Sequence, residues 1–416
     1  MKLKNIIINK KWNFGEFGWR YVAEPLIPIL EEISNAFFEL KKDKSFINNL
    51  KKLHKNYIWR PSPLVYAKNL TQKLGWAEIF LKNEWVNHTW AHKINHCVGQ
   101  ALLAKYLGKK RIIAETWAGQ HGLATASICA KLWLECTIYM WYKDYKRQMP
   151  NVIYMQQAWA EVIPVYEWNQ SLRDAVNAAL KDLINHSNKS HYLLGTTCGP
   201  HPYPSMNAFF QKIIGEEAKK QLRTYYKTKT KINPDYLISC VWGGSNSIGL
   251  FYDFLDENNV NLIGVEAWGK WTNTKYHASR FTSKKIWFVE WYKSYFLQDQ
   301  NWQVKDTYSI SAWLDYSWVS PQLAYLEKIW RVKITSATDQ EALEATKTLM
   351  KTEWILPALE SAHWLAEVIK LAPQLDKSQK IICNISWRGD KDLFITAPKL
   401  SSSFNEFLEN FLKNKT

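Results

Sequence analysis

Apolar and polar positions along this chain form two patterns that alternate and predict strands and helices in turn. Short apolar runs typical of buried strands recur, and most precede a stretch with the 3.6-residue spacing of an amphipathic helix. We expect strands at residues 77–81, 111–115, 136–140, 161–165, 192–194, 236–241, 262–267 and 380–385. We expect helices at residues 26–40, 119–132, 151–158, 172–184, 205–222, 247–255, 339–352 and 361–371, and another from residue 94.

This order of elements predicts an α/β fold with mostly parallel, twisted sheets flanked by helices. In such sheets ligands bind beyond the carboxyl ends of the strands. The loops after Glu115, Val241 and Ile385 are therefore the places to look for chemistry. Residues 268–303 show no clean period, and we expect a long loop or lid there.

The first candidate residue is Lys93, which lies between a predicted strand and a predicted helix. At the first turn of a helix the peptide dipole favours anions, and a lysine there could serve as an amine nucleophile. A solvated lysine at a helix start is the simpler interpretation. The neighbouring residues alone favour that simpler interpretation.

The second candidate is the turn Gly243-Gly244-Ser245-Asn246, between a strand and a helix. Glycines let successive backbone N–H groups face one anion, and the helix start adds partial positive charge. The alternative is a tight turn in which Asn246 or Ser245 caps the helix. The double glycine favours a phosphate cradle.

Two further loops follow predicted strands. Residues 115–122 carry hydroxyl and backbone donors that could hold a carboxylate, and Glu115 could move protons. A capped helix start explains this loop about equally well, and the loop at residues 384–390 is a weaker signal alone. Together, an amine, a phosphate cradle and a carboxylate loop suggest pyridoxal phosphate acting on an amino acid.

Composition narrows the class of protein. The chain has 416 residues, 47% of them hydrophobic, and lacks any apolar run of the 18 or so residues that would span a membrane. Residues 1–12 lack the apolar core of a signal peptide, so we expect a cytoplasmic protein. Six scattered cysteines without a C-x-x-C pair predict reduced thiols and argue against a zinc site.

The formal charge of +16 could indicate a nucleic-acid partner. The lysines are spread along the chain, however, and the sequence is rich in Lys, Asn and Ile together. An A+T-rich coding bias explains that composition, and we expect no nucleic-acid partner.

From about Phe14 to Thr396 the chain resembles the β subunit of tryptophan synthase. The stretches that carry the resemblance include F-G-E-F-G-x-R-Y-V, N-H-T-x-A-H-K-I-N, I-I-A-E-T-x-A-G-Q-H-G, G-G-S-N-S-I-G, P-A-L-E-S-A-H and S-x-R-G-D-K-D. The resemblance implies the two-lobed fold type II of pyridoxal-phosphate enzymes, with the cofactor between the lobes. It implies an N-terminal lobe at 1–213 and a C-terminal lobe at 214–416. Within the first, 108–195 would be a mobile communication subdomain, and 59–91 would pack on the other lobe.

The resemblance also implies a cofactor site. Lys93 would bind the cofactor covalently, with His92 beside the phosphate, Ser386 facing the pyridine nitrogen and Glu360 near the ring. The residues that would hold the phosphate are Gly243, Gly244, Ser245 and Asn246. A monovalent cation, Na⁺ or K⁺, would lie near Trp242, Tyr316 and Trp318.

On the substrate side, Glu115 would be the acid and base that helps expel the serine hydroxyl and then deprotonates indole. Arg147 and Asp315 would close the mobile subdomain over the site. The residues that would bind the substrate carboxylate are Thr116, Ala118, Gly119, Gln120 and His121.

The implied reaction replaces the hydroxyl of L-serine by indole, giving L-tryptophan and water. An α subunit would deliver the indole within an α2β2 assembly built on a β–β dimer. Another pyridoxal-phosphate lyase, such as a serine or threonine dehydratase, is the alternative enzyme, and Glu115 speaks against it. A subunit that is inactive and only activates its α partner is the alternative without chemistry.

Tryptophan stands where this family has glycine in almost every motif. The positions within motifs are Trp19, Trp90, Trp117, Trp242, Trp313 and Trp387, and further ones are Trp59, Trp76, Trp133, Trp141, Trp159, Trp330 and Trp354. By our alignment roughly twenty of the 23 tryptophans follow this rule, with Trp85 and Trp364 less clear. Replacing all 23 would raise glycine from about 4% to about 9% of the chain, nearer the usual value of about 7%.

We therefore hypothesise that the source organism reads UGA codons as glycine. Trp242 would begin the phosphate turn, where glycine permits close backbone approach, and Trp90 and Trp387 would crowd the cofactor. Overpacking costs about 1–3 kcal/mol per site, and several such sites exceed a typical stability of about 5–15 kcal/mol. We expect the chain with tryptophan to fold poorly or to bind no cofactor.

Overall fold

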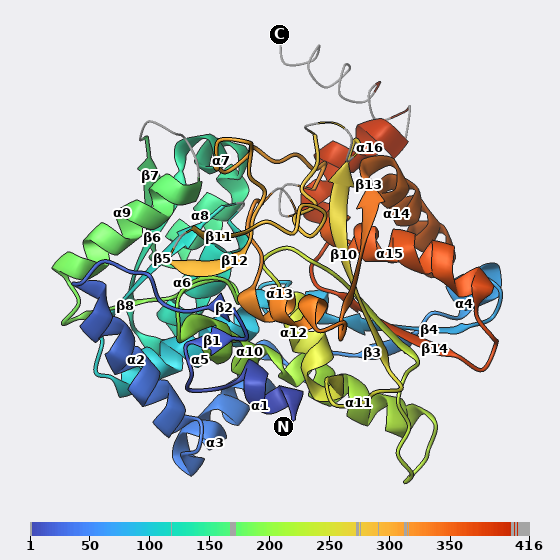
Figure 1. The fold of residues 1–416 in the computed structure, drawn as a ribbon, viewed down its shortest axis with the longest axis horizontal. Coiled ribbons are helices and arrows are strands. Elements are labelled where there is room, and N and C mark those ends of the chain that lie inside the picture. Colours follow the sequence, from blue (N-terminus) through green and yellow to red (C-terminus); the bar gives the residue numbers. More distant parts are fainter. Residues whose placement is uncertain are drawn as a thin grey trace.

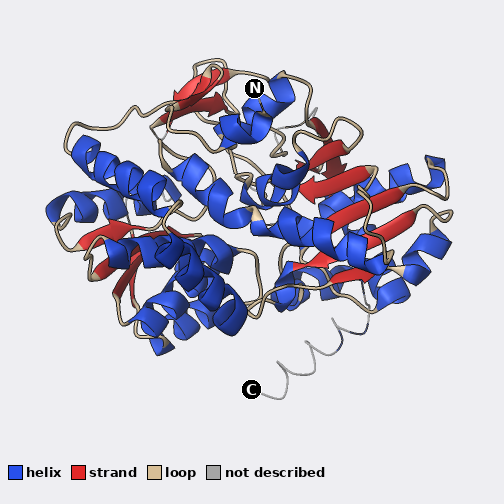
Figure 2. Ribbon diagram, turned by 90° about the horizontal axis from the view of Figure 1, so that it is seen from below, coloured by secondary structure: helices blue, strands red, loops and turns tan. Residues whose placement is uncertain are grey.

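The computed structural model describes residues 2–117, 119–166, 172–271, 274, 276–289, 291–311, 314, 316–400, 403 and 406. Two parallel sheets lie side by side, one on the left and one on the right of Figure 1, and Figure 2 shows helices on both faces of them. The prediction of an α/β fold with mostly parallel sheets flanked by helices is confirmed.

The larger sheet has six strands. Their order is β13 (Lys333–Thr338), β10 (Asn261–Gly269), β9 (Tyr236–Cys240), β14 (Lys380–Ile385), β4 (Glu78–Asn83) and β3 (Leu64–Tyr66). Only β3 runs antiparallel to its neighbour. Its two early strands bring residues 64–83 beside strands from the second half of the chain.

The smaller sheet has four parallel strands. Their order is β7 (Glu161–Val165), β6 (Glu135–Trp141), β5 (Arg111–Thr116) and β8 (Ser190–Tyr192). The helices α6 (Gln120–Leu132), α8 (Met149–Gln157) and α9 (Leu172–Asn185) pack around it. Every strand predicted in this part exists, although β8 begins and ends two residues before the predicted 192–194.

A buried helix, α5 (Lys93–Tyr106), runs through the centre of the molecule. All its residues from Lys93 to Ala104 are buried, so no face of it meets solvent over three turns. It packs against α6 and against α10 (Tyr203–Gln211), which in turn contacts α12 (Ser245–Phe251). This chain of contacts links the two sheets through the helices that begin at the candidate loops.

The remaining helices cover the outside. They are α1 (Leu3–Ile7), α2 (Leu26–Leu40), α3 (Lys44–Leu53), α4 (Lys68–Lys73), α7 (Tyr142–Arg147), α11 (Ile213–Tyr225), α13 (Pro321–Lys328), α14 (Asp339–Glu353), α15 (Leu359–Leu371) and α16 (Leu393–Leu400). Helix α14 starts with a capping box, in which Thr338 and Glu341 exchange hydrogen bonds. The helix predicted at 26–40 agrees with α2.

Two predictions of local structure are wrong. Residues 268–303 are not all loop, because β11 (Ile286–Val289) and β12 (Tyr292–Tyr295) form a hairpin. This hairpin joins β1 (Asn13–Phe14) and β2 (Phe17–Gly18) in a small antiparallel sheet. The paired strands lie so far apart in the sequence that no local pattern reveals their pairing. The helix predicted at 205–222 is two helices, α10 and α11, which meet at Lys212.

Tryptophan occupies backbone conformations that favour glycine. Among the described residues, thirteen other than glycine have a positive φ, and ten of these are tryptophan, with φ from 55° to 80°. They are Trp19, Trp59, Trp76, Trp90, Trp133, Trp159, Trp291, Trp302, Trp330 and Trp354. Side chains with a Cβ are strained in this left-handed region, which glycine enters freely.

Three of these tryptophans cap a helix. Trp133 follows α6 at φ 58° and ψ 46°, and Trp354 follows α14 at φ 55° and ψ 35°. Trp59 ends the short π-helical turn at His54–Ile58 with φ 67° and ψ 33°. A left-handed residue after a helix is usually glycine. Trp85 and Trp364, by contrast, have no positive φ.

Among the described residues, no helix is long and apolar enough to cross a membrane.

Candidate active site

One cavity collects residues from five separate stretches of the chain. It lies where α5 and α12 begin and where β9 and β14 end. Its volume is about 40 Å³, and its lining consists of Ala91, His92, Lys93, Cys240, Trp242, Gly244, Ser245, Asn246, Leu314, Glu360, Ser386 and Trp387. The cavity therefore lies at the carboxyl ends of parallel strands, where ligands were expected to bind.

Lys93 is the first residue of α5, as the sequence predicted. Its side chain is buried, its Nζ donates to the carbonyl oxygen of Gly195 at 2.7 Å, and it lies 4.3 Å from the centre of the Trp242 ring. Burial lowers the pKa of Lys93 to about 8, so about a tenth of this amine is neutral at pH 7, far more than for an ordinary lysine. A neutral amine is the form that attacks an aldehyde.

The glycine turn lies against the start of α5. Gly244 has φ +104°, and a Cβ there would meet the Cβ of Ser320 at 2.7 Å, so this position needs glycine. Ser245 Oγ lies 3.2 Å from Nε2 of His92, while Nδ1 of His92 faces the carbonyl of Ser386 at 3.3 Å. Burial lowers the pKa of His92 to about 3, which keeps the ring neutral.

Asn246 is held by the end of the strand before it. Its amide nitrogen donates to Ser239 Oγ at 2.7 Å, and its oxygen accepts from Asn384 on β14. Gly243 completes the turn, and its carbonyl accepts from Thr197 at 3.2 Å. The four residues of the predicted cradle form one hydrogen-bonded turn, and Gly244, Ser245 and Asn246 line the cavity.

Ser386 and Glu360 line the same cavity as the turn. The Oγ of Ser386 is 3.4 Å from Ser361 Oγ and 4.0 Å from Cys240 Sγ, so it has only neutral neighbours. Glu360 lies in the first turn of α15 and forms a buried ion pair with Lys391 at 3.1 Å.

Glu115 lines a second cavity of about 40 Å³ beside the first. It is the penultimate residue of β5 and is buried. Thr116 accepts from the backbone N–H of Gly122 at 3.1 Å, which ties the loop to the start of α6. Trp242 lines both cavities and so separates Lys93 from the space next to Glu115.

The remaining carboxylate-loop residues lie at the start of α6. Gly119 has φ +85° and precedes the helix, and Gln120 donates to the carbonyl of Thr89 near Lys93. His121 donates through Nε2 to the carbonyl of Leu193 at 2.9 Å, and burial lowers its pKa to about 3. Ala118 lies outside the described residues.

The pair predicted to close the mobile subdomain is Arg147 and Asp315. Arg147, the last residue of α7, is half exposed and pairs with Asp144 at 2.5 Å. Asp315 lies outside the described residues.

Arg280 donates hydrogen bonds to the backbone carbonyls near the position expected for the cation. Buried Arg280 donates to the carbonyl oxygens of Tyr316 at 3.1 Å and Trp318 at 3.0 Å, and to that of Val241 at 2.7 Å. Glu266 accepts from its Nε at 2.7 Å and balances the charge. The guanidinium thus occupies carbonyls beside the position expected for Na⁺ or K⁺.

Sequence reasoning missed a buried cluster of charges beneath α5. Arg60 donates to Glu84 and Glu217, and Lys82 donates to Glu217 at 2.7 Å. Arg60 also donates to Asn95, two residues after Lys93, at 2.9 Å. The position of Lys82 inside an apolar strand could have indicated this cluster, because a buried charge requires a partner.

The donor groups of the main cavity suit pyridoxal phosphate. An amine, a backbone turn at a helix start, and neutral imidazole and hydroxyl groups face a common space. The space itself does not suit it, because ligand pockets commonly measure about 300–1,000 Å³ and this one about 40 Å³. The side chains of Trp242 and Trp387 line this cavity.

Comparison with known proteins agrees with this chemistry. A family model described as pyridoxal-phosphate dependent enzyme matches residues 56–386. The tryptophan synthase beta chain of Ruegeria pomeroyi is 46% identical over 399 residues, which are 96% of this chain and 95% of that protein. The chain belongs to the tryptophan synthase β-chain family. As a member of this family it is a pyridoxal-phosphate dependent enzyme, and the resemblance seen in its motifs is confirmed.

Proposed function

We propose that this chain, with glycine at most positions written as tryptophan, replaces the hydroxyl of L-serine by indole to form L-tryptophan and water. The observation that carries the proposal is the single cavity on which Lys93, the glycine turn, Glu360 and Ser386 converge. Its similarity over 96% of the chain to a tryptophan synthase beta chain supports the same reaction.

On the cofactor side, Lys93 would attach the cofactor through its amine, and the turn at residues 243–246 with His92 would hold the phosphate. When bound, pyridoxal phosphate supplies an electron sink for bonds at the amino-acid α-carbon. Ser386 would offer the pyridine nitrogen a neutral hydroxyl, which would leave that nitrogen unprotonated and temper the sink. Glu360, held by Lys391, would stand near the ring.

On the substrate side, Glu115 would protonate the departing hydroxyl and then take the proton of indole. Glu115 is buried and lines the cavity beside the one that Lys93 lines, which places a carboxyl group next to the proposed reaction space. Thr116, Ala118, Gly119, Gln120 and His121 would hold the substrate carboxylate. A dehydratase needs no base placed to accept a proton from indole, and Glu115 therefore favours the replacement reaction.

We also propose the assembly that the family implies. An α subunit would supply indole to an α2β2 complex built on a β–β dimer, in the cytoplasm. Residues 108–195 would form a mobile subdomain that Arg147 and Asp315 close. The lobes would divide near residue 213, with 59–91 packed on the second lobe, where β3 and β4 join its sheet.

We further propose that UGA encodes glycine in the source organism. Ten described tryptophans at positive φ, and two more in the wall of the cofactor cavity, support glycine at these positions. Mass spectrometry of the protein from its native host tests this directly. Glycine at all 23 positions predicts a mass about 3 kDa below that of the chain as written, and a mass with 23 tryptophans would refute it.

The activity test uses the chain with glycine at these positions. Addition of pyridoxal phosphate should produce a visible absorption band, and L-serine followed by indole should then yield tryptophan. Lys93→Ala should lose both, whereas Lys391→Ala, which leaves the amine in place, should keep the band. Glu115→Gln should keep the band and lose tryptophan formation; pyruvate instead of tryptophan from the unmodified enzyme would support the dehydratase.

A further inference from the structure

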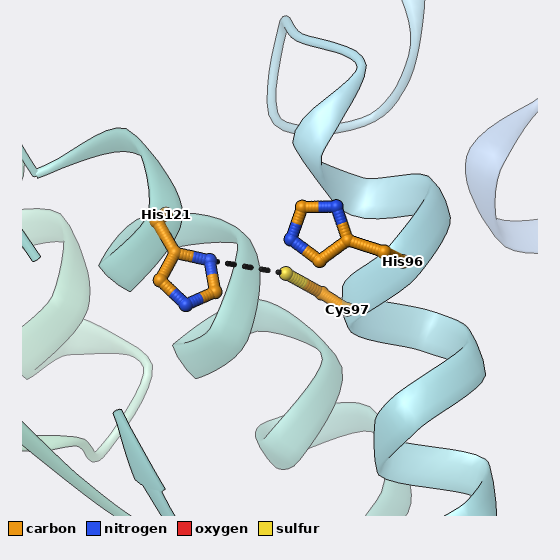
Figure 3. Close-up of side chains that lie close together, drawn as sticks. All are labelled: His96, Cys97 and His121. Carbon is orange, nitrogen blue, oxygen red and sulfur yellow. Dashed lines mark hydrogen bonds between the residues drawn. The ribbon is translucent and has the colours of Figure 1, made fainter. Parts of the chain in front are cut away.

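Three metal-ligating side chains meet away from the cofactor cavity. His96 and Cys97 are consecutive residues of α5, and His121 lies in the first turn of α6 (Figure 3). One nitrogen of each ring and the Cys97 sulfur lie within 4.8 Å of one another, and all three side chains are buried. The packing of α5 against α6 brings them together, which explains why the scattered cysteines of the sequence did not reveal them.

The donor atoms of this triad face the space between them. Cys97 Sγ is 3.6 Å from Nδ1 of His121, and the other nitrogen of His121 is held by the Leu193 carbonyl. A hydrogen bond through Nε2 fixes a tautomer whose Nδ1 lone pair faces Cys97. Nε2 of His96 is buried, has no hydrogen-bond partner, and points toward Cys97 and His121 in Figure 3.

We propose that His96, Cys97 and His121 form a buried site for one zinc-class cation, which shares His121 with the proposed carboxylate loop and lies outside the lining of the cofactor cavity. One thiolate and two imidazoles are a ligand set that Zn²⁺ favours, with the fourth position left for water. Ligands around tetrahedral zinc lie about 3.5 Å apart, so Cys97 and His121 already have the required spacing and His96 must approach by about 1 Å.

Binding changes the protonation of two groups. Burial raises the pKa of the Cys97 thiol to about 12, so the metal displaces that proton to solvent as the sulfur–zinc bond forms. Coordination through Nε2 of His96 places the ring proton on Nδ1, 2.7 Å from the side-chain amide of Gln211. The amide nitrogen of Gln211 faces Nδ1, and its oxygen accepts from Asn95, so the amide must turn over for its oxygen to accept from the Nδ1 proton when metal binds.

The test measures metal without any reference to turnover. Untagged full-length protein is dialysed against Zn²⁺, and bound zinc is counted by elemental analysis. In parallel, Co²⁺ is added, because a thiolate ligand gives cobalt an intense near-ultraviolet charge-transfer band. We expect about one metal per chain and this band.

Variants then locate the metal. Cys97→Ala should abolish the cobalt band, and His96→Asn should weaken zinc binding by more than the roughly 10- to 100-fold that loss of an outer partner costs. Cys383→Ala removes another buried thiol, from β14, and should bind metal as the parent does. Circular dichroism confirms that each variant is folded. Protein without bound metal, or a Cys97→Ala variant that retains the cobalt band, would overturn the proposal.

Discussion

Glycine should stabilise this protein wherever tryptophan now adopts a positive φ. The best positions for the test are four strained and largely exposed tryptophans, because their indoles make few contacts. They are Trp133, Trp159, Trp330 and Trp354, with φ of 58°, 61°, 59° and 55° and exposed fractions of 84%, 78%, 88% and 84%. The perturbation replaces all four by glycine, and a matched protein replaces all four by alanine.

The expected magnitude follows from the backbone. A left-handed conformation destabilises a residue with a Cβ by about 1–2 kcal/mol relative to glycine. Glycine, in turn, loses more conformational entropy on folding, which offsets about 0.5–1 kcal/mol of this difference. The net difference between glycine and alanine is therefore about 1 kcal/mol per position, or about 4 kcal/mol in total. At about 2.1 cal/mol/K per residue, the unfolding entropy of 416 residues is about 0.9 kcal/mol/K. The glycine protein should melt about 4–5 °C above the alanine protein.

Comparison with alanine isolates the backbone contribution. Trp133 and Trp159 have ring centres 6.4 Å apart, and Lys284 lies 5.6 Å from the ring of Trp330. Both replacements lose these contacts equally, so the difference in melting temperature excludes them. At Trp287, in β11 and without a positive φ, the order should reverse, because glycine weakens a strand. Equal melting temperatures for the glycine and alanine proteins would refute the assignment of strain.

Three further predictions concern the site and its support. Loading of the glycine form with pyridoxal phosphate should accelerate from pH 7 to pH 9 with a midpoint near the Lys93 pKa of about 8, and a rate independent of pH would contradict a buried amine. Glu217→Gln leaves Arg60 and Lys82 with a single carboxylate, that of Glu84. We expect the free energy of unfolding to fall by about 3–5 kcal/mol, which lowers the melting temperature by about 3–6 °C. The control Glu78→Gln, at the partly exposed start of β4, should change the melting temperature little. Replacement of K⁺ and Na⁺ by a bulky organic cation should leave the activity unchanged because Arg280 occupies the Tyr316 and Trp318 carbonyls, and Arg280→Leu should create a cation requirement.

Local patterns predicted the elements that carry the chemistry. The strands at Arg111–Thr116 and Lys380–Ile385 and the start of α5 at Lys93 follow from apolar runs and helical spacing. The pairing of the Asn13–Gly18 segment with β12 was not predictable, since residues almost 280 positions apart in sequence share no local signal.

The same distinction applies to the site. The amine, the glycine turn and the strand-end carboxylate were each visible as a short motif. Three features depend on how helices and strands pack: the Arg60 charge cluster, the Arg280 guanidinium under the carbonyls, and the triad at His96. Each consists of residues that are unremarkable in sequence and become informative only when burial removes water from a charge or a lone pair.

The tryptophans occupy two kinds of position that share only one requirement. At helix ends such as Trp133 and Trp354 the constraint is a left-handed backbone, whereas at Trp242 and Trp387 it is space beside a cofactor. Absence of a Cβ is the only side-chain property that satisfies both. Gly244, with φ +104° and Ser320 within 2.7 Å of a built Cβ, meets the same two constraints and is still glycine. Structure does not separate the retained glycines from the tryptophans. The codon rule that we propose, which acts without regard to position, would account for both groups.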